Sequence, residues 1–162
     1  MSPRKHLYLV IAPLATAVLA LAFAACGEEG AEAATVNVAL SEWLIEPDRD
    51  SVPAGEVTFV AANEGTIEHE LVIIKTDLAD DSLPTHQEDQ EMLGVVDEEA
   101  EGVQVIDEIE EFEPDGEESL TLDLEPGNYV LICNIGPEGE EGEHGAHGSH
   151  YEEGMHTSLT VE

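Results

Sequence analysis

The residues of this chain best suited to chemistry are a cysteine and a histidine–methionine pair near its C-terminus. Cys133 ends the apolar run YVLIC, and His150 and Met155 lie close together in the stretch HYEEGMH. A further histidine, His69, opens the apolar run HELVIIK far upstream. One thiolate, two imidazoles and a weakly bound thioether form the donor set of a mononuclear copper site that exchanges electrons. The sequence therefore predicts such a centre, if the fold brings the four residues together.

The number of cysteines supports this interpretation of Cys133. The chain contains 2 cysteines, and the first, Cys26, belongs to the N-terminal segment discussed next. Cys133 then has no partner for a disulfide within the folded part. A lone thiol in an exported protein is open to oxidation unless it has a role, and metal ligation is one such role. An inert buried cysteine is the other interpretation that composition leaves open.

The N-terminal segment has the pattern of an export signal. Residues 1–25 combine a basic head, an apolar stretch and small residues directly before Cys26. This junction resembles the lipobox of bacterial lipoproteins, in which cleavage leaves a lipidated N-terminal cysteine. We expect a signal peptide over 1–25, a lipidated N-terminus and linker over 26–34, and one folded domain over 35–162. The expected location is the outer face of the cell membrane, or the periplasm. An uncleaved membrane anchor is the alternative.

The charge of the chain is extremely negative. It contains 38 Asp and Glu against 4 Lys and Arg, and only Arg49 and Lys75 lie beyond the signal segment. Nucleic acids and anionic lipid head groups are therefore excluded as partners, because phosphate contacts need Lys and Arg. Partner proteins with basic docking surfaces are favoured, and strong self-repulsion is consistent with a monomer.

The pattern of the domain predicts an all-β fold. Short apolar or alternating runs are separated by Gly and Pro turns, which indicates a Greek-key β-sandwich of about seven strands. The acidic stretch 76–101 is expected to be a solvated excursion, and the Gly-rich stretch 136–149 to be mobile. Trp43 and Tyr129 are expected to be packing residues. The runs expected to form strands are 35–43, 52–65, 69–75, 102–110, 118–127, 128–135 and 156–162.

The domain resembles the cupredoxin family of blue copper proteins, which includes plastocyanin and azurin. The resemblance rests on the Asn63–Gly65 turn that leads to a histidine, on the strand YVLICN, and on HYEEGMH before the last strand. It implies a sandwich fold with one type 1 copper ion and electron transfer as the function. It also implies that the second histidine ligand lies near the surface as the port for electrons. By this resemblance the equatorial ligands are His69, Cys133 and His150, and the axial ligand is Met155.

Two features depart from the family pattern. Residues 134–149 separate the cysteine from His150, whereas only a few residues do so in the family. Long flexible insertions cost little in closure entropy, but His144 and His147 lie on the same loop and are rival ligands. We favour His150 because the methionine follows it at the family spacing. Secondly, Glu70 follows the first histidine where relatives often have Asn, and its charge is expected to lower the reduction potential.

The histidines of the late loop allow a second interpretation. His144, His147 and His156, together with His150, either form a secondary, weaker site for Cu(II), Zn(II) or Ni(II), or have no ligand role. The function expected for the chain is a membrane-tethered, extracytoplasmic carrier of single electrons between redox partner proteins. Because the four donors leave no open coordination position, we expect no catalytic residues and no enzyme activity. The alternative function is copper binding for sequestration or delivery.

Overall fold

The computed structural model of the protein describes residues 33–87, 93–137 and 148–162. Over these residues the chain forms nine β-strands and no helix, and hence no helix long and apolar enough to cross a membrane. The strands are β1 (Ala34–Ser41), β2 (Leu44–Pro47), β3 (Ser51–Val52), β4 (Gly55–Asn63), β5 (His69–Lys75), β6 (Gln104–Phe112), β7 (Glu117–Leu124), β8 (Gly127–Ile132) and β9 (His156–Val161).

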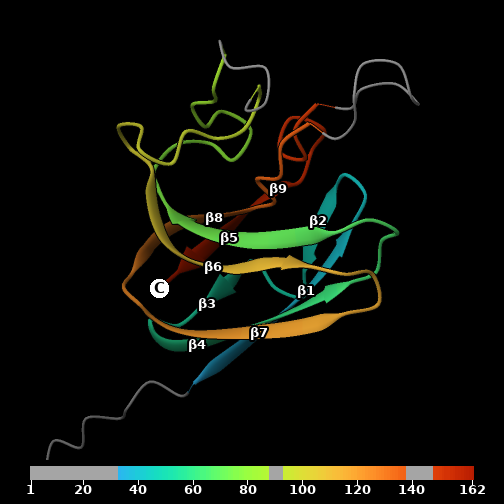
Figure 1. Cartoon of the computed structure of the whole chain (residues 1–162). Coiled ribbons are helices and arrows are strands. Elements are labelled where there is room, and N and C mark those ends of the chain that lie inside the picture. Colours follow the sequence, from blue (N-terminus) through green and yellow to red (C-terminus); the bar gives the residue numbers. More distant parts are fainter. Residues whose placement is uncertain (1–32, 88–92, 138–147) are drawn as a thin grey trace, which may run out of the picture.

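The strands form two sheets that face each other as the layers of a sandwich (Figure 1). One sheet has the order β2-β1-β4-β7 and the other the order β3-β9-β8-β5-β6. Most pairs are antiparallel, but β1 runs parallel to β4 and β3 runs parallel to β9. The predicted all-β sandwich is confirmed. Its two additional strands are short: β2 lies between the first two predicted runs, and β3 includes the first residue of the second run.

The core between the sheets follows from the alternation of apolar residues along the strands. In β4 every second side chain is buried, including Phe59 at 0% exposure, and β1 alternates in the same way. Leu71 and Leu131 meet them from the opposite sheet in one apolar cluster. Because successive side chains of a strand point to opposite faces, this period of two places one apolar face of each sheet inside.

β5 and β8 differ from the other strands because both of their faces are buried. Val72 and Val130 point away from the sandwich core, yet both are 2% exposed or less. A second apolar cluster covers them, and it includes Leu83 and Val96 from the segment between β5 and β6. We call residues 76–103 the covering segment. The prediction of a solvated excursion here was wrong for its described parts, because apolar residues among the carboxylates pack on this outer face.

The core predicts a large cost for truncating its central aromatic ring. Phe59→Ala removes a fully buried side chain from β4, and we expect a loss of about 3 to 5 kcal/mol in the free energy of unfolding. Chemical denaturation measures this loss. Leu78→Ala, at a side chain that is 39% exposed, is the control and should change stability by less than about 0.5 kcal/mol. Equal effects of the two variants would contradict the described packing.

Candidate metal centre

The ends of neighbouring strands bring the predicted donors together. His69 is the first residue of β5, Cys133 follows the last residue of β8, and Met155 precedes the first residue of β9. β8 pairs with both β5 and β9 in antiparallel fashion, so these three residues share one edge of the five-stranded sheet. The pairing continues one step beyond the strands, where the N–H of Cys133 donates to the carbonyl of Met155 at 3.1 Å.

The side chains of His69, Cys133 and His150 converge at this edge. The Sγ atom of Cys133 lies 3.2 Å from Nδ1 of His150 and 3.9 Å from Nδ1 of His69. One donor atom from each of the three residues lies within 4.8 Å of the other two. All three side chains are 1% exposed or less, and so is Met155. Among the described residues, His150 is the histidine of the late loop that joins the cluster.

These separations suit a metal ion bound by all three atoms. Metal bonds of about 2.3 Å to sulfur and about 2.0 Å to imidazole nitrogen, as in zinc sites, place donors in a trigonal plane about 3.5 to 3.8 Å apart. The two measured distances to sulfur bracket this range closely. Nδ1 of His69 is the nitrogen that faces Cys133. Nε2, on the other side of the ring, is buried and has no hydrogen-bond partner among the described residues.

Burial fixes the protonation of the donors in the absence of a cation. Desolvation is the main cause that lowers the pKa of His69 to about 4, and the neighbouring His150 is the second. Desolvation likewise raises the pKa of the Cys133 thiol to about 12. The site therefore favours neutral imidazoles and an uncharged thiol, and a thiolate becomes stable there only with a compensating positive charge. A thiophilic metal cation supplies that charge and displaces the thiol proton on binding.

Met155 is tied to both neighbouring ligands through its backbone. Its N–H donates to the carbonyl of His150 at 3.0 Å, and its carbonyl accepts from Cys133 as described above. Its side chain is 0% exposed and belongs to the same apolar cluster as Cys133. The three convergent donors fit a type 1 copper ion, for which Met155 is the predicted axial donor.

Glu70 links the strand of the first histidine to the strand of the cysteine. Its N–H points at the Sγ atom of Cys133 at 3.5 Å, and its carboxylate accepts from the N–H of Asn134 at 2.7 Å. Burial is the main cause that raises the pKa of Glu70 to about 7, and the carboxylates of Glu108 and its neighbours add to it. Glu70 thus joins the two ligand strands through its backbone N–H and its side-chain carboxylate.

The turn before His69 is held by a buried amide. Asn63 accepts from the N–H of Gly65 at 3.0 Å and donates to the carbonyls of Ile67 and Phe112 at 2.8 Å and 3.0 Å. A Cβ atom on Gly65 would lie 2.9 Å from Nε2 of His69. Only glycine thus permits the close approach of this backbone to the imidazole. The predicted Asn63–Gly65 turn therefore shapes the site.

The covering segment holds the residues next to the late ligands. The hydroxyl of Tyr151 donates to the carbonyl of Asp80 at 2.8 Å and accepts from the N–H of Leu83 at 2.9 Å. Ser149 donates to the carbonyl of Gly94 at 2.6 Å. The side chain of Asn134, next to the cysteine, bonds both the N–H and the carbonyl of Val96, at 2.7 Å and 3.2 Å. Cys133 and His150 thus each have a neighbouring residue that is hydrogen-bonded to the covering segment.

The remaining predicted residues have different outcomes. His156 lies at the start of β9, where its Nδ1 is 2.8 Å from a carboxylate oxygen of Asp80, and it is not part of the donor cluster. His144 and His147 lie outside the described residues, as does Cys26 with the whole signal segment. The secondary metal site and the lipidation therefore stay predictions.

One expectation about His150 was wrong. The resemblance placed this residue near the surface as the electron port, but it is 1% exposed. The ring of Trp43 meets it edge-on, with centroids 5.3 Å apart and planes at 81°. Sequence reasoning treated Trp43 as a packing residue only, because no motif connects it with the late loop. It also missed Tyr151 and Ser149, although both flank the predicted ligand directly.

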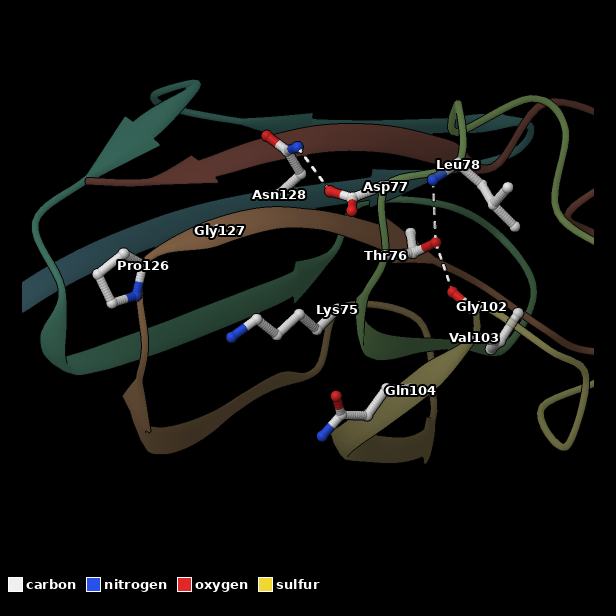
Figure 2. A pocket seen from close by; sticks show the side chains of 10 residues that line it. All are labelled: Lys75, Thr76, Asp77, Leu78, Gly102, Val103, Gln104, Pro126, Gly127 and Asn128. Atoms are coloured by element: carbon white, nitrogen blue, oxygen red, sulfur yellow. Dashed lines mark hydrogen bonds between the residues drawn. The ribbon is translucent and has the colours of Figure 1, made fainter.

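A hollow at the far ends of β5 and β8 is separate from the donor cluster. Figure 2 shows its lining, with Thr76 bonded to Gly102 and Leu78, and Asn128 bonded to Asp77. Its volume is ≈ 610 Å³. The hydrogen bonds of its polar groups stabilise the chain reversals at that end of the sheet, and it holds none of the predicted donors.

No family model matches the chain, and no curated protein matches it. Among solved structures it is similar to auracyanin from Roseiflexus castenholzii, with 23% identity, coverage of 82% of this chain and 99% of that chain, and a TM-score of 0.49. It is also similar to auracyanin A of Chloroflexus aurantiacus, a "blue" copper protein, with 16% identity, 79% and 98% coverage, and a TM-score of 0.45.

A third similar structure is rusticyanin from Thiobacillus ferrooxidans, with 17% identity, coverage of 79% of this chain and 77% of that chain, and a TM-score of 0.42. The strand order and the donor cluster described above belong to this chain itself. They give it a two-sheet β-sandwich whose donor cluster fits one type 1 copper ion.

Proposed function

We propose that this protein is a blue copper carrier of single electrons, exported and tethered to the membrane through Cys26. The observation that carries the proposal is the buried convergence of His69, Cys133 and His150 beside Met155. A thiolate and two imidazoles with a weak thioether suit both oxidation states of copper. Copper bound by these residues would supply a one-electron couple at the end of a rigid sandwich.

The burial of the donors supports a carrier rather than an enzyme. His69, Cys133 and Met155 are 0% exposed, and His150 is 1% exposed. A substrate would need an open coordination position and a path for its atoms. An electron needs neither, because it crosses a few ångströms of packed side chains without moving atoms. The exclusion of water also protects the thiol from oxidation.

The packing of the covering segment supports rapid exchange of electrons. Ser149 and Tyr151 flank His150, and both donate hydrogen bonds to this segment. With its neighbours fixed, His150 keeps its position although it ends a long inserted loop. A ligand held in one place needs little rearrangement when the charge of a metal changes, and this is the property that a carrier requires.

The charge of the chain supports a cationic redox partner. Both basic residues of the domain are already paired, Arg49 with Asp48 at 2.9 Å and Lys75 with Glu125 at 3.0 Å. The many remaining carboxylates leave a strongly negative surface, which accelerates encounters with basic proteins. Anchoring at the membrane surface through Cys26 would keep the carrier near membrane-bound donors and acceptors.

The first prediction concerns colour. Addition of Cu(II) to the protein should give an intense visible absorption from charge transfer between the Cys133 thiolate and copper. Cys133→Ser and His69→Ala should abolish this band, since each removes an equatorial donor. His86→Ala, a histidine outside the donor cluster, is the matched control and should keep it.

Two outcomes of this experiment would contradict the carrier. If the band survives in Cys133→Ser, the thiol is not a ligand. If copper binds without the band in the unaltered protein, sequestration or delivery becomes the better function. Circular dichroism of each variant shows whether the sandwich is folded.

The second prediction concerns Tyr151. Tyr151→Phe leaves the N–H of Leu83 and the carbonyl of Asp80 without their partner, which should cost about 1 to 3 kcal/mol of stability. Because His150 then loses its support, the electron paramagnetic resonance spectrum of the Cu(II) form should broaden, and copper should leave the protein several times faster.

Tyr129→Phe is the matched control, since its hydroxyl donates to the carbonyl of Glu125 at the other end of the sheet. It should cost similar stability and leave the resonance spectrum unchanged. Equal spectral changes in the two variants would show that the support of His150 does not depend on Tyr151.

The third prediction concerns the potential. Glu70→Gln keeps an oxygen that can accept from Asn134. Above pH 7, where the carboxyl of Glu70 is ionised, it also removes a negative charge beside two ligands. Loss of the negative charge favours Cu(I) relative to Cu(II), so the midpoint potential should rise by several tens of millivolts. Voltammetry measures the shift, with Glu113→Gln as a control outside these contacts. A potential that falls or does not change would contradict the assigned influence of Glu70.

A further inference from the structure

Trp43 stands out because it combines an uncommon backbone conformation with contact to a buried donor. It lies in the turn between β1 and β2 and has a φ of 66°. A positive φ is rare for a bulky side chain, and it persists only where the surroundings hold it. Its half-buried ring meets the imidazole of His150 edge-on at 5.3 Å.

Contacts on both sides fix this turn. The carboxylate of Glu42 accepts from both the N–H and the hydroxyl of Thr66, at 2.5 Å and 2.7 Å, in the loop that leads to the first histidine. On the other side, a Cβ atom on Gly154 would lie 3.2 Å from the carbonyl of Trp43. The turn is thus packed against both of the loops that carry histidine donors.

This arrangement decides how electrons can reach the centre. Every donor side chain is 1% exposed or less, so no partner can touch a ligand directly. Trp43 has an aromatic ring that contacts His150, and as a residue it is only half-buried. The next residue in the chain, Leu44, is 43% exposed and adds an apolar side chain to the surface.

The charges around this face indicate the kind of partner. Glu152 and Glu153 are exposed and directly precede Gly154, the residue packed on the Trp43 backbone. Glu42 contributes a further carboxylate, whose pKa is lowered to about 2 by the hydrogen bonds from Thr66. An apolar centre with a rim of carboxylates is complementary to a redox protein that presents a basic rim.

We propose that Trp43 and Leu44 form the face at which this protein exchanges electrons with a cationic one-electron partner, with the Trp43 ring as the connection to His150. The proposal rests on the proposed function and replaces direct contact at a histidine ligand. No bond forms or breaks in the exchange: one electron leaves the reduced centre and the oxidised partner accepts it.

Three exposed leucines provide a matched test. Among the described residues, the large apolar side chains that are exposed are Leu44 at 43%, Leu78 at 39% and Leu93 at 40%. Leu44 adjoins Trp43, whereas Leu78 lines the hollow at the far ends of β5 and β8 (Figure 2). Leu93 precedes Gly94, which lies against the side chain of Glu152, so Leu93 is an intermediate position and Leu78 is the remote control. Substitution of each by Lys adds the same charge at a similarly exposed position.

The first readout does not require copper. The chain contains 1 tryptophan, so fluorescence of the metal-free protein reports on Trp43 alone. Hexaamminecobalt(III), a small trivalent cation, should quench it. Leu44→Lys should lower the quenching constant about threefold or more at low salt, with the difference shrinking in about 1 M salt. Leu78→Lys should lower it much less, and Leu93→Lys should have an intermediate effect.

The second readout is the rate at which the copper(I) protein is oxidised by tris(phenanthroline)cobalt(III). Copper(I) loses one electron to become copper(II), and cobalt(III) gains it to become cobalt(II). Leu44→Lys should slow this reaction by about the same factor, while Leu44→Glu should accelerate it. The visible band and the midpoint potential should stay unchanged in every variant.

Equal slowing by all three Lys variants, or the largest slowing by Leu93→Lys or Leu78→Lys, would overturn the exchange face. In that case the colour of the copper protein would remain, so the proposed function would stand. Absence of the colour in the unaltered protein would instead overturn the proposed function, and the fluorescence measurement would still test whether cations gather at Trp43.

Discussion

The feature on which the rest of the structure depends is the burial of one thiol and two imidazoles at a single edge of a sheet. Away from water, Cys133 resists ionisation and His69 resists protonation, so the cluster is stable with neutral groups or with a cation among them. Strand pairing holds His69 and Cys133, and backbone hydrogen bonds hold His150, so the three groups have little freedom to separate. The same burial that protects the thiol also keeps partners from touching the ligands.

Holding the donors in place requires packing on both faces of β5 and β8. One face belongs to the core between the sheets, and the other is covered by Leu83 and Val96 of the covering segment. The hydrogen bonds from Ser149 and Tyr151 join the late ligand loop to this cover. A long insertion before His150 is tolerated because its far end is fixed by these contacts rather than by the length of the loop.

Much of this could be predicted from the sequence, where the signals are local. Alternating apolar residues indicated the sandwich, and the positions of His69 and Cys133 at the ends of apolar runs indicated the edge where they meet. The covering segment was missed because its few apolar residues stand among many carboxylates, and charge dominates the pattern. The contact of Trp43 with His150 joins two distant turns through a positive φ, which no spacing in the sequence reveals.

X-ray absorption at the copper edge of the loaded protein tests the central claim most directly. The account predicts one short bond from copper to sulfur together with two bonds to imidazole nitrogen. Loss of the sulfur scattering in Cys133→Ser would identify the donor. A spectrum of the unaltered protein with nitrogen and oxygen ligands alone would contradict the claim, because it would place copper outside the buried cluster of His69, Cys133 and His150.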